Sequence, residues 1–422
     1  MLTQVHLSTT HGPSSLGYWI IVIATTLSYT VNSGLTPLIN RGASTELHTS
    51  SMAAGALVAS ATFTSLVCMV VSAPLTDRFG PRTVCAASQA IAVSALLAPI
   101  LTLSIQSIII NRLLYGAGNA GITLTTTVWV TRNVPMNQRG RVFGYYGVSV
   151  WVGLAVGPVF CESVATIYGI RAAFIGLALL QSISWLLLLC VLGGPIHIAG
   201  KSVQRLDYRR TSSFNNKTYR KNSNLWILAT GCWIPCLLGV VSWGSEGAVV
   251  TFTMQHLQQF GIPSVGVLSS ASLFIVLTVF VIAARGVFGS FPDHIGPVPI
   301  ICISSVILAF GILVLAMART LFTGAAGTAL IGIGYSPMYP ALALLVTQRL
   351  PLYLHSHGLA MFSASTSVGF YLGSFAAGAI IDFEGTTAAF LCFAALQCLC
   401  LIPLTLGSLR TAHLNTLDSS TK

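Results

Sequence analysis

The stretch Ala73-Pro74-Leu75-Thr76-Asp77-Arg78-Phe79-Gly80-Pro81-Arg82 decides the interpretation of this chain. It places an acid, two arginines, a glycine and a proline between two long apolar runs, and Asp293-His294-Ile295-Gly296-Pro297 repeats part of it 216 residues later. The same offset aligns further pairs: Gly116 with Gly332, Gly118 with Gly334, Gly153 with Gly369, Gly157 with Gly373 and Gln181 with Gln397. We infer an internal duplication, which in a membrane protein is typical of a transporter built from related halves.

The composition indicates a polytopic membrane protein. Only 7% of residues are charged and 54% are hydrophobic, with a mean hydropathy of +0.82, whereas about 25% of a soluble chain is charged. The net charge of +11 would suggest nucleic acid in a soluble domain, but in a membrane protein it reports topology, so we expect no nucleic-acid partner. The ten cysteines lie mostly in apolar runs, and we infer no metal site or cofactor from them.

Windows of about 20 apolar residues predict twelve membrane-spanning helices, six in each repeat, and hence an all-α membrane protein of two pseudo-symmetric six-helix bundles. The windows lie near 17–39, 52–74, 83–102, 105–130, 141–165, 171–193, 225–250, 266–289, 298–318, 321–346, 357–381 and 386–407. We expect an N-terminal bundle at 1–193, a basic cytoplasmic linker at 194–224, and a C-terminal bundle with a short cytoplasmic tail at 225–422.

The distribution of positive charge predicts the orientation. With both termini inside, sixteen of the twenty lysines and arginines fall on the cytoplasmic side, three fall outside, and Arg112 lies within a span. We therefore expect a multi-pass protein of the plasma membrane, or of the inner membrane if the source is bacterial. Its partners would be the lipid bilayer, protons and a small-molecule substrate, and we expect a monomer.

Residues 73–82 resemble the loop motif G-x-L-A-D-R-x-G-R-R/K between the second and third helices of the major facilitator superfamily, although Ala73 replaces the first glycine and Pro81 alters the basic pattern. The resemblance extends over all twelve spans. In the family this loop forms charge contacts that differ between inward and outward states, so the resemblance implies a cytoplasmic gate. Its residues would be Asp77, Arg78, Arg82 and, from the second half, Asp293.

The fourth span carries Arg112-Leu113-Leu114-Tyr115-Gly116-Ala117-Gly118-Asn119-Ala120, which is similar to a second family motif, R-x-x-x-G-x-G-x-A. A guanidinium inside a span is costly unless it faces a wet cavity or a partner acid. The spacing of Arg112, Tyr115, Asn119 and Thr123 places them on one helix face. We expect that face to line the transport path; the alternative is an arginine that reaches the outer interface.

The fifth span contains Gly153, Gly157 and Pro158 in a pattern similar to G-x-x-x-G-P-x-x-G-G, which the family associates with proton-coupled exporters. Small residues four apart let two helices pack closely. The final glycine pair of the motif is replaced here by Cys161-Glu162. This replacement makes the motif a weaker indication of antiport. It also places an acid, Glu162, near the outer end of the fifth span.

Glu162 and Glu246 are the candidates for proton coupling, because they are the acids expected within spans among only nine in the chain. A carboxylate near Arg112 could exchange a proton for a substrate. Alternatively, both side chains reach outside water. The nine histidines, His256 among them, are expected in loops or tails and offer no catalytic alternative.

In the family that the chain resembles, the first, fourth, seventh and tenth helices line a central cavity. Besides Tyr115, Asn119 and Thr123 of the fourth, the candidates are Thr25, Tyr29 and Asn32 of the first, Trp243 of the seventh, and Tyr335 and Tyr339 of the tenth. Aromatic and neutral polar side chains suit a partly apolar or amphipathic small molecule.

The leading hypothesis is a secondary transporter that exports such a molecule by alternating access in exchange for protons. The alternatives are a facilitator or proton symporter for a small metabolite or an organic anion held by Arg112, and a membrane receptor of transporter ancestry. We do not expect an enzyme, because the spans show no converging nucleophile, base or metal ligands.

Overall fold

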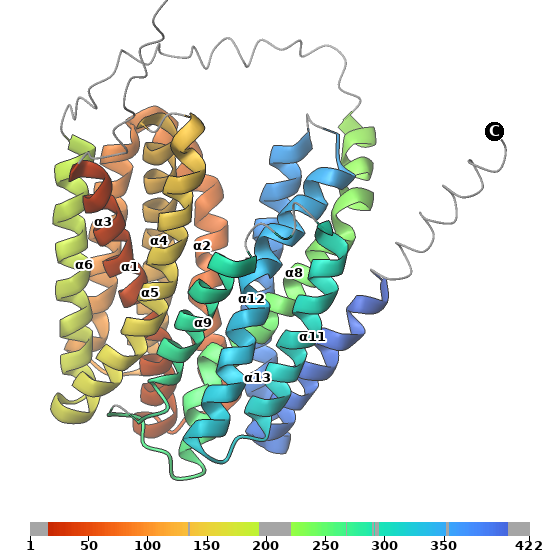
Figure 1. The fold of residues 1–422 in the computed structure, drawn as a ribbon. Helices are drawn as coiled ribbons and strands as arrows, with labels where there is room; N and C mark the ends of the chain where they lie inside the picture. The colour runs from red at the N-terminus through yellow and green to blue at the C-terminus, as the bar shows by residue number, and fades with distance from the viewer. Residues whose placement is uncertain are drawn as a thin grey trace, which may run out of the picture.

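A computed structural model describes residues 16–133, 136–193, 221–266, 268–288, 291, 295–351 and 354–403, and its helices form two bundles (Figure 1). The first bundle contains α1 (Leu16–Arg41), the short π-helix η1 (Gly42–Glu46), α2 (Ser51–Phe79), α3 (Pro81–Leu101), α4 (Ile105–Asn133), α5 (Met136–Tyr168) and α6 (Ile170–Gly193). The second contains α8 (Lys221–Gln258), α9 (Leu273–Phe288), α11 (Pro297–Ala316), α12 (Leu321–Arg349) and α13 (His355–Leu399).

Positive-φ glycines divide both bundles in the same way. Gly385, with φ of 85°, breaks α13 into two helices, and Gly169, with φ of 86°, separates α5 from α6. Gly80 and Gly296, with φ of 82° and 92°, each precede a helix that begins with proline. Both pairs are 216 residues apart, and the left-handed region favours glycine because it has no Cβ. The predicted all-α fold of two related six-helix bundles is confirmed.

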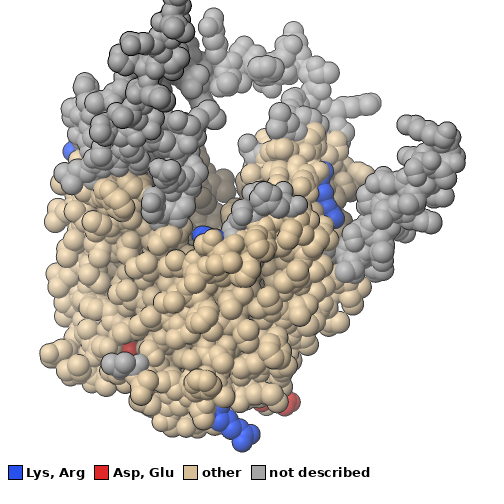
Figure 2. Space-filling model, viewed as in Figure 1, with Lys and Arg blue, Asp and Glu red and all other residues tan. Residues whose placement is uncertain are grey.

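The helices have the length and composition of a multi-pass membrane protein. Among the described residues, eight helices are long and apolar enough to cross a membrane when α13 is counted once, and α9 is a shorter apolar helix of 16 residues. The visible surface between the two ends of the molecule is almost free of charged side chains (Figure 2). Lipid therefore replaces water around most of the described helices.

Equivalent buried hydrogen bonds hold the core of each bundle together. Gln181 Nε2 donates to Gln89 Oε1 over 2.6 Å and to Ser28 Oγ over 3.3 Å, which links α6, α3 and α1. In the second bundle Gln397 Nε2 donates to Ser305 Oγ over 3.2 Å and to Ser242 Oγ over 3.1 Å. Both glutamines are fully buried, and polar side chains inside a membrane bundle pair across helices in this way.

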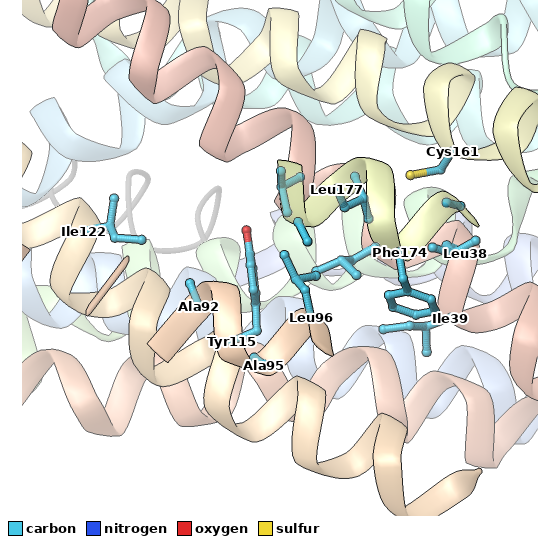
Figure 3. Close-up of a cluster of buried hydrophobic side chains, with 14 of the residues drawn as sticks. Leu38, Ile39, Ala92, Ala95, Leu96, Tyr115, Ile122, Cys161, Phe174 and Leu177 are labelled. Atoms are coloured by element: carbon cyan, nitrogen blue, oxygen red, sulfur yellow. The ribbon is translucent and has the colours of Figure 1, made fainter. Parts of the chain in front are cut away.

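Around this network the first bundle packs apolar side chains from several helices (Figure 3). Leu38 and Ile39 of α1 lie beside Phe174 of α6, while Leu96 of α3 lies beside Tyr115 of α4. Small residues bring the helices close enough for these contacts. A Cβ on Gly118 would lie 2.6 Å from the Ser88 carbonyl oxygen, and a Cβ on Gly334 would lie 3.0 Å from that of Ser304, at the same offset of 216.

The two bundles meet at the end of the molecule that contains Gly169 and Gly385, which we call the Gly169 end. There Asp382 of α13 accepts hydrogen bonds from the backbone N–H groups of Ser51 and Met52, over 2.7 and 2.8 Å, at the start of α2. Asn40 Nδ2 of α1 donates to the Thr251 carbonyl of α8 over 3.0 Å. A Cβ on Gly378 would clash with the Ser51 carbonyl. The bundles are therefore closed against each other at this end.

At the opposite end, which contains Gly80 and which we call the Gly80 end, the bundles diverge (Figure 1). In the part of α2 towards this end, Val70, Val71 and Phe79 are 75%, 55% and 52% exposed. Figure 2 shows the surface hollowed between the bundles here. The conformation is thus closed at the Gly169 end and open at the Gly80 end.

Several helix boundaries differ from those expected. α1 continues to Arg41, and α8 continues to Gln258, so His256 is not in a loop. It is fully buried, with Nδ1 2.6 Å from Thr386 Oγ1 and its ring edge-on to Phe390. The prediction for His256 was wrong because the apolar window ended too early. Residues 194–220, most of the expected linker, and Asp293 of the expected gate lie outside the described residues.

We expect Gly378→Ala to shift the protein towards a conformation that is open at the Gly169 end, because the added methyl group has no room beside Ser51. Spin labels at Glu46 and Gln258, which are exposed on the two bundles at that end, would report a longer distance in double electron–electron resonance. Gly286→Ala is the matched control, because a Cβ there meets no atom within 4 Å. An unchanged distance distribution in Gly378→Ala would contradict this account of the closed end.

Candidate functional site

A cavity of about 350 Å³ lies between the two bundles, on the Gly80 side of the contacts that close the molecule. Its volume falls within the range of roughly 300–1,000 Å³ that is usual for small-molecule sites. Its lining residues come from five helices: Tyr29, Asn32 and Thr36 of α1; Ala61, Thr62 and Ser65 of α2; Arg112, Gly116 and Asn119 of α4; Trp243 of α8; and Thr366, Ser367 and Phe370 of α13.

Among the described residues of this lining, Arg112 is the only one with a charge. Its side chain is 3% exposed, and the guanidinium is fixed against α2: Nη2 donates to the Val58 carbonyl over 2.7 Å, and Nε donates to the Leu57 carbonyl over 3.3 Å. Nη1 donates no hydrogen bond to a described residue. The arrangement holds a cation rigidly in the wall, with a buried Nη1 whose N–H donors have no described partner.

Most of the other described lining residues carry polar, uncharged side chains. Asn32 and Asn119 supply amides, and the hydroxyl groups come from the serines and threonines of α1, α2 and α13. Trp243 and Phe370 place aromatic surface on the side of the second bundle. Because the described lining residues include a cation and no acid, the electrostatic potential of the cavity favours an anionic ligand.

The sequence-predicted cavity residues divide into two groups. Tyr29, Asn32, Asn119 and Trp243 line the cavity, as does Arg112. The others, Thr25, Tyr115, Thr123, Tyr335 and Tyr339, are not part of its lining.

Two of the residues outside the lining support the walls from within the bundles. Tyr115 is 1% exposed and its hydroxyl donates to the Ser28 carbonyl over 3.4 Å, and Tyr335 is 4% exposed and its hydroxyl donates to the Ser242 carbonyl over 2.8 Å. Thr25 is also buried. Tyr339, at 42% exposure, packs its ring edge-on against Trp243 with 5.7 Å between the ring centroids.

The contributions of α2 and α13 were missed in the sequence. Thr62 and Ser65 lie one helical turn apart in α2, next to Ser60 and Thr64, and Ser367 and Phe370 lie one turn apart in α13. The cluster of hydroxyl residues to which Thr62 and Ser65 belong was a usable signal for α2. The cavity extends to these helices because α2 and α13 pack across the bundles at the Gly169 end and diverge towards the Gly80 end.

Glu162 does not face Arg112. Its Oε2 accepts a hydrogen bond from Arg41 Nη1 over 2.6 Å, and among the described residues this is the only ion pair. The Glu162 side chain is 2% exposed, so the alternative that it reaches outside water is wrong, while that of Arg41 is 29% exposed. Arg41 also donates to Thr166 Oγ1 over 3.0 Å. The pair links the end of α1 to α5 near the Gly169 end.

Glu246 lies one turn beyond Trp243 on α8 and is half-buried. It interacts electrostatically with Tyr335, and no ion pair in the described part of the chain joins it to Arg112. Glu246 corresponds to Asn32, which lines the cavity, because α1 and α8 align at an offset of 214 through Ser28 and Ser242. The duplication thus gives Glu246 the position equivalent to that of a cavity-lining residue, although Glu246 is not itself in the lining.

Comparison with known proteins identifies the family. The sequence profile described as Major Facilitator Superfamily matches residues 21–357 and, again, residues 281–419. The chain belongs to the major facilitator superfamily.

Uncharacterized transporters of this superfamily are similar in sequence. One from Methanocaldococcus jannaschii is 21% identical over 283 residues, which cover 67% of this chain and 70% of that protein. One from Salmonella typhimurium is 25% identical over 360 residues, which cover 83% of this chain and 86% of that protein. The protein is accordingly a membrane transporter of the major facilitator type.

Solved structures of transporters share the fold at low sequence identity. The peptide transporter POT (a mutant in complex with alafosfalin) gives a TM-score of 0.75 at 11% identity, and the alignment covers 93% of this chain and 94% of that one. The nucleoside transporter NupG gives a TM-score of 0.70 at 14% identity, and the alignment covers 93% of this chain and 99% of that one. At such identities the likeness establishes the fold alone.

Two other motifs of this superfamily member have defined surroundings. Asp77 and Arg78 end α2, Arg82 begins α3, and all three are exposed at the Gly80 end, where the bundles diverge. In α5, which contains Pro158, a Cβ on Gly153 would lie 2.6 Å from the Cβ of Tyr29. A Cβ on Gly157 would clash with the Thr30 carbonyl. These two glycines therefore set the position of a cavity-lining tyrosine on α1.

We expect Arg41→Met to lower the thermal stability of this transporter more than Glu162→Gln does. The first change leaves a carboxylate buried without its cation, at a cost of about 3 kcal/mol, whereas the second leaves an arginine that reaches water. Thermal unfolding in detergent measures the effect, and the double variant Arg41→Met/Glu162→Gln should recover much of the stability. Equal losses for both single variants, without recovery, would contradict a structural role for the pair.

Proposed function

We propose that this protein is a secondary transporter that carries a small organic anion across the membrane by alternating access, with the anionic group bound at Arg112. The observation that supports the proposal is the lining of the cavity between the bundles, where a rigidly held guanidinium is the only charge on a described residue. The amides of Asn32 and Asn119 supply further hydrogen-bond donors. This function is one of the alternatives that the sequence left open, and the polar lining favours it over a predominantly apolar substrate.

Alternating access follows from the two ends of the molecule. Closure at the Gly169 end rests on a few hydrogen bonds between the bundles and on close contacts at small residues, both of which can separate as the bundles rock. The positive-inside rule predicts that the Gly80 end faces the cytoplasm. In that orientation the present conformation is inward-facing, and Asp77, Arg78 and Arg82 lie at the expected cytoplasmic gate.

We expect Arg112→Gln to raise the KM of the wild-type substrate anion about tenfold or more, because charge-assisted hydrogen bonds contribute more than neutral ones. Counterflow into proteoliposomes, screened with a panel of aliphatic and aromatic carboxylates and their uncharged amides, measures this. Arg112→Lys should keep part of the affinity, and Arg319→Gln, at an exposed position, should keep all of it. Equal uptake of acids and amides by the wild-type protein would refute anion transport, and binding without flux would identify a receptor.

Proton coupling, if the transporter uses it, we assign to Glu246 in preference to Glu162. Glu246 lies one helical turn from the cavity-lining Trp243 on α8, whereas Glu162 is held by Arg41. We expect Glu246→Gln to abolish proton movement driven by the anion while anion counterflow continues, because exchange of substrate requires no change in protonation. A pH-sensitive dye inside proteoliposomes reports proton movement. Glu384→Gln, an exposed acid, is the control, and coupled proton flux in Glu246→Gln would show that another group carries the proton.

The direction of proton movement in the same assay separates antiport from symport. Opposite movement of proton and anion gradients would support the export in exchange for protons that the sequence led us to expect. Parallel movement would support a symporter, and anion flux without proton movement would support a facilitator.

A further inference from the structure

We propose that the substrate anion carries an aromatic ring and that Trp243 is the surface on which this ring stacks. The inference rests on the proposed anion transport and adds to it a second recognition element, supplied by the opposite bundle. Arg112 stands in the wall formed by the first bundle, and Trp243 stands in the wall formed by the second. A ligand with a carboxylate at one end and an aromatic ring at the other would satisfy both walls at once.

Trp243 is held in place by an aromatic cluster on its own bundle. Its ring centroid lies 5.7 Å from that of Tyr339 and 6.2 Å from that of Phe362, with edge-on interplanar angles of 74° and 89°. Tyr335 lies at 6.3 Å and anchors the adjacent backbone by donating to the Ser242 carbonyl. The indole of Trp243 lines the cavity, and three rings that are not part of the lining hold it in place.

A fixed indole is a better platform than a free one, because little conformational entropy is lost when a ring stacks on it. Phe370 lines the cavity from α13 and Tyr29 from α1, so further aromatic surface adjoins the same space. Within the lining, the second bundle adds Thr366 and Ser367 but no charge. The cavity thus has a polar cationic wall and a wall that offers aromatic surface with hydroxyl groups.

A ligand that must contact both walls of the cavity has a role in transport. Because Arg112 and Trp243 belong to different bundles, a ligand that touches both restrains the bundles relative to each other. An aliphatic acid of the same charge would still bind at Arg112 but would gain less from the second wall. Discrimination between aromatic and aliphatic acids is therefore the property that depends on Trp243.

The test compares benzoate with cyclohexanecarboxylate, which has the same charge and a ring of similar size without π electrons. Inhibition constants of both acids are measured by competition in the counterflow assay. We expect the wild-type protein to prefer benzoate by about fivefold, as aromatic pairing contributes beyond burial of area. Trp243→Phe should retain most of the preference, and Trp243→Leu should remove it. Trp233→Leu, on the same helix at a side chain that is 50% exposed, should leave it unchanged.

The comparison of benzoate with benzamide in the same variants separates this inference from the proposed function. If benzoate is preferred over benzamide in the wild type but not over cyclohexanecarboxylate, anion transport stands and the aromatic site is overturned. The aromatic site is also overturned if Trp243→Leu weakens the binding of benzoate and of cyclohexanecarboxylate equally. If neither acid binds, or if Arg112→Gln leaves the preference for benzoate over benzamide intact, the proposed function is overturned and this inference with it.

Discussion

The structure depends on how one guanidinium is accommodated inside a membrane-spanning bundle. Arg112 cannot reach water along its own helix, so it donates to two carbonyl oxygens of α2 whose lone pairs are not exhausted by the helix itself. This ties α4 to α2 and requires a polar cavity on the remaining side of the charge. The hydroxyl and amide groups of the lining, the absence of an acid from it and its place between the bundles are all consistent with that one requirement.

Lipid provides little driving force for helices to associate, so each bundle is held by close packing and by buried hydrogen bonds. Both devices are duplicated. The glutamine clusters centred on Gln181 and Gln397, and the close approaches at Gly118 and Gly334, recur at an offset of 216 residues. The first helices of the halves align instead at 214, through Ser28 and Ser242. The difference of two residues falls in the connections, so helix faces are preserved while loop lengths change.

Much of the fold could be predicted from the sequence, because apolar windows, turn glycines and the repeat offset are local signals. Gly80 and Gly296 are such turn glycines, at equivalent positions of the repeat. Five of the thirteen residues that line the cavity could also be predicted, among them Arg112 and Asn119, which share a helix face. Helix faces alone could not show that Tyr115 and Tyr335 turn into their bundles, or that Arg41 reaches Glu162. Those outcomes depend on tilts and crossings of helices distant in sequence.

The contact between Asp382 and α2 has a consequence for the backbone itself. The first amide groups of a helix have no partner within it, and those of Ser51 and Met52 receive theirs from a carboxylate on the other bundle. The next amide, of Ala53, is satisfied locally by the Ser50 side chain. When the bundles separate at the Gly169 end, α2 loses the hydrogen bonds to Asp382, and its first turn can fray. Opening would then be accompanied by a local melting of helix, visible as faster hydrogen–deuterium exchange at two neighbouring amides.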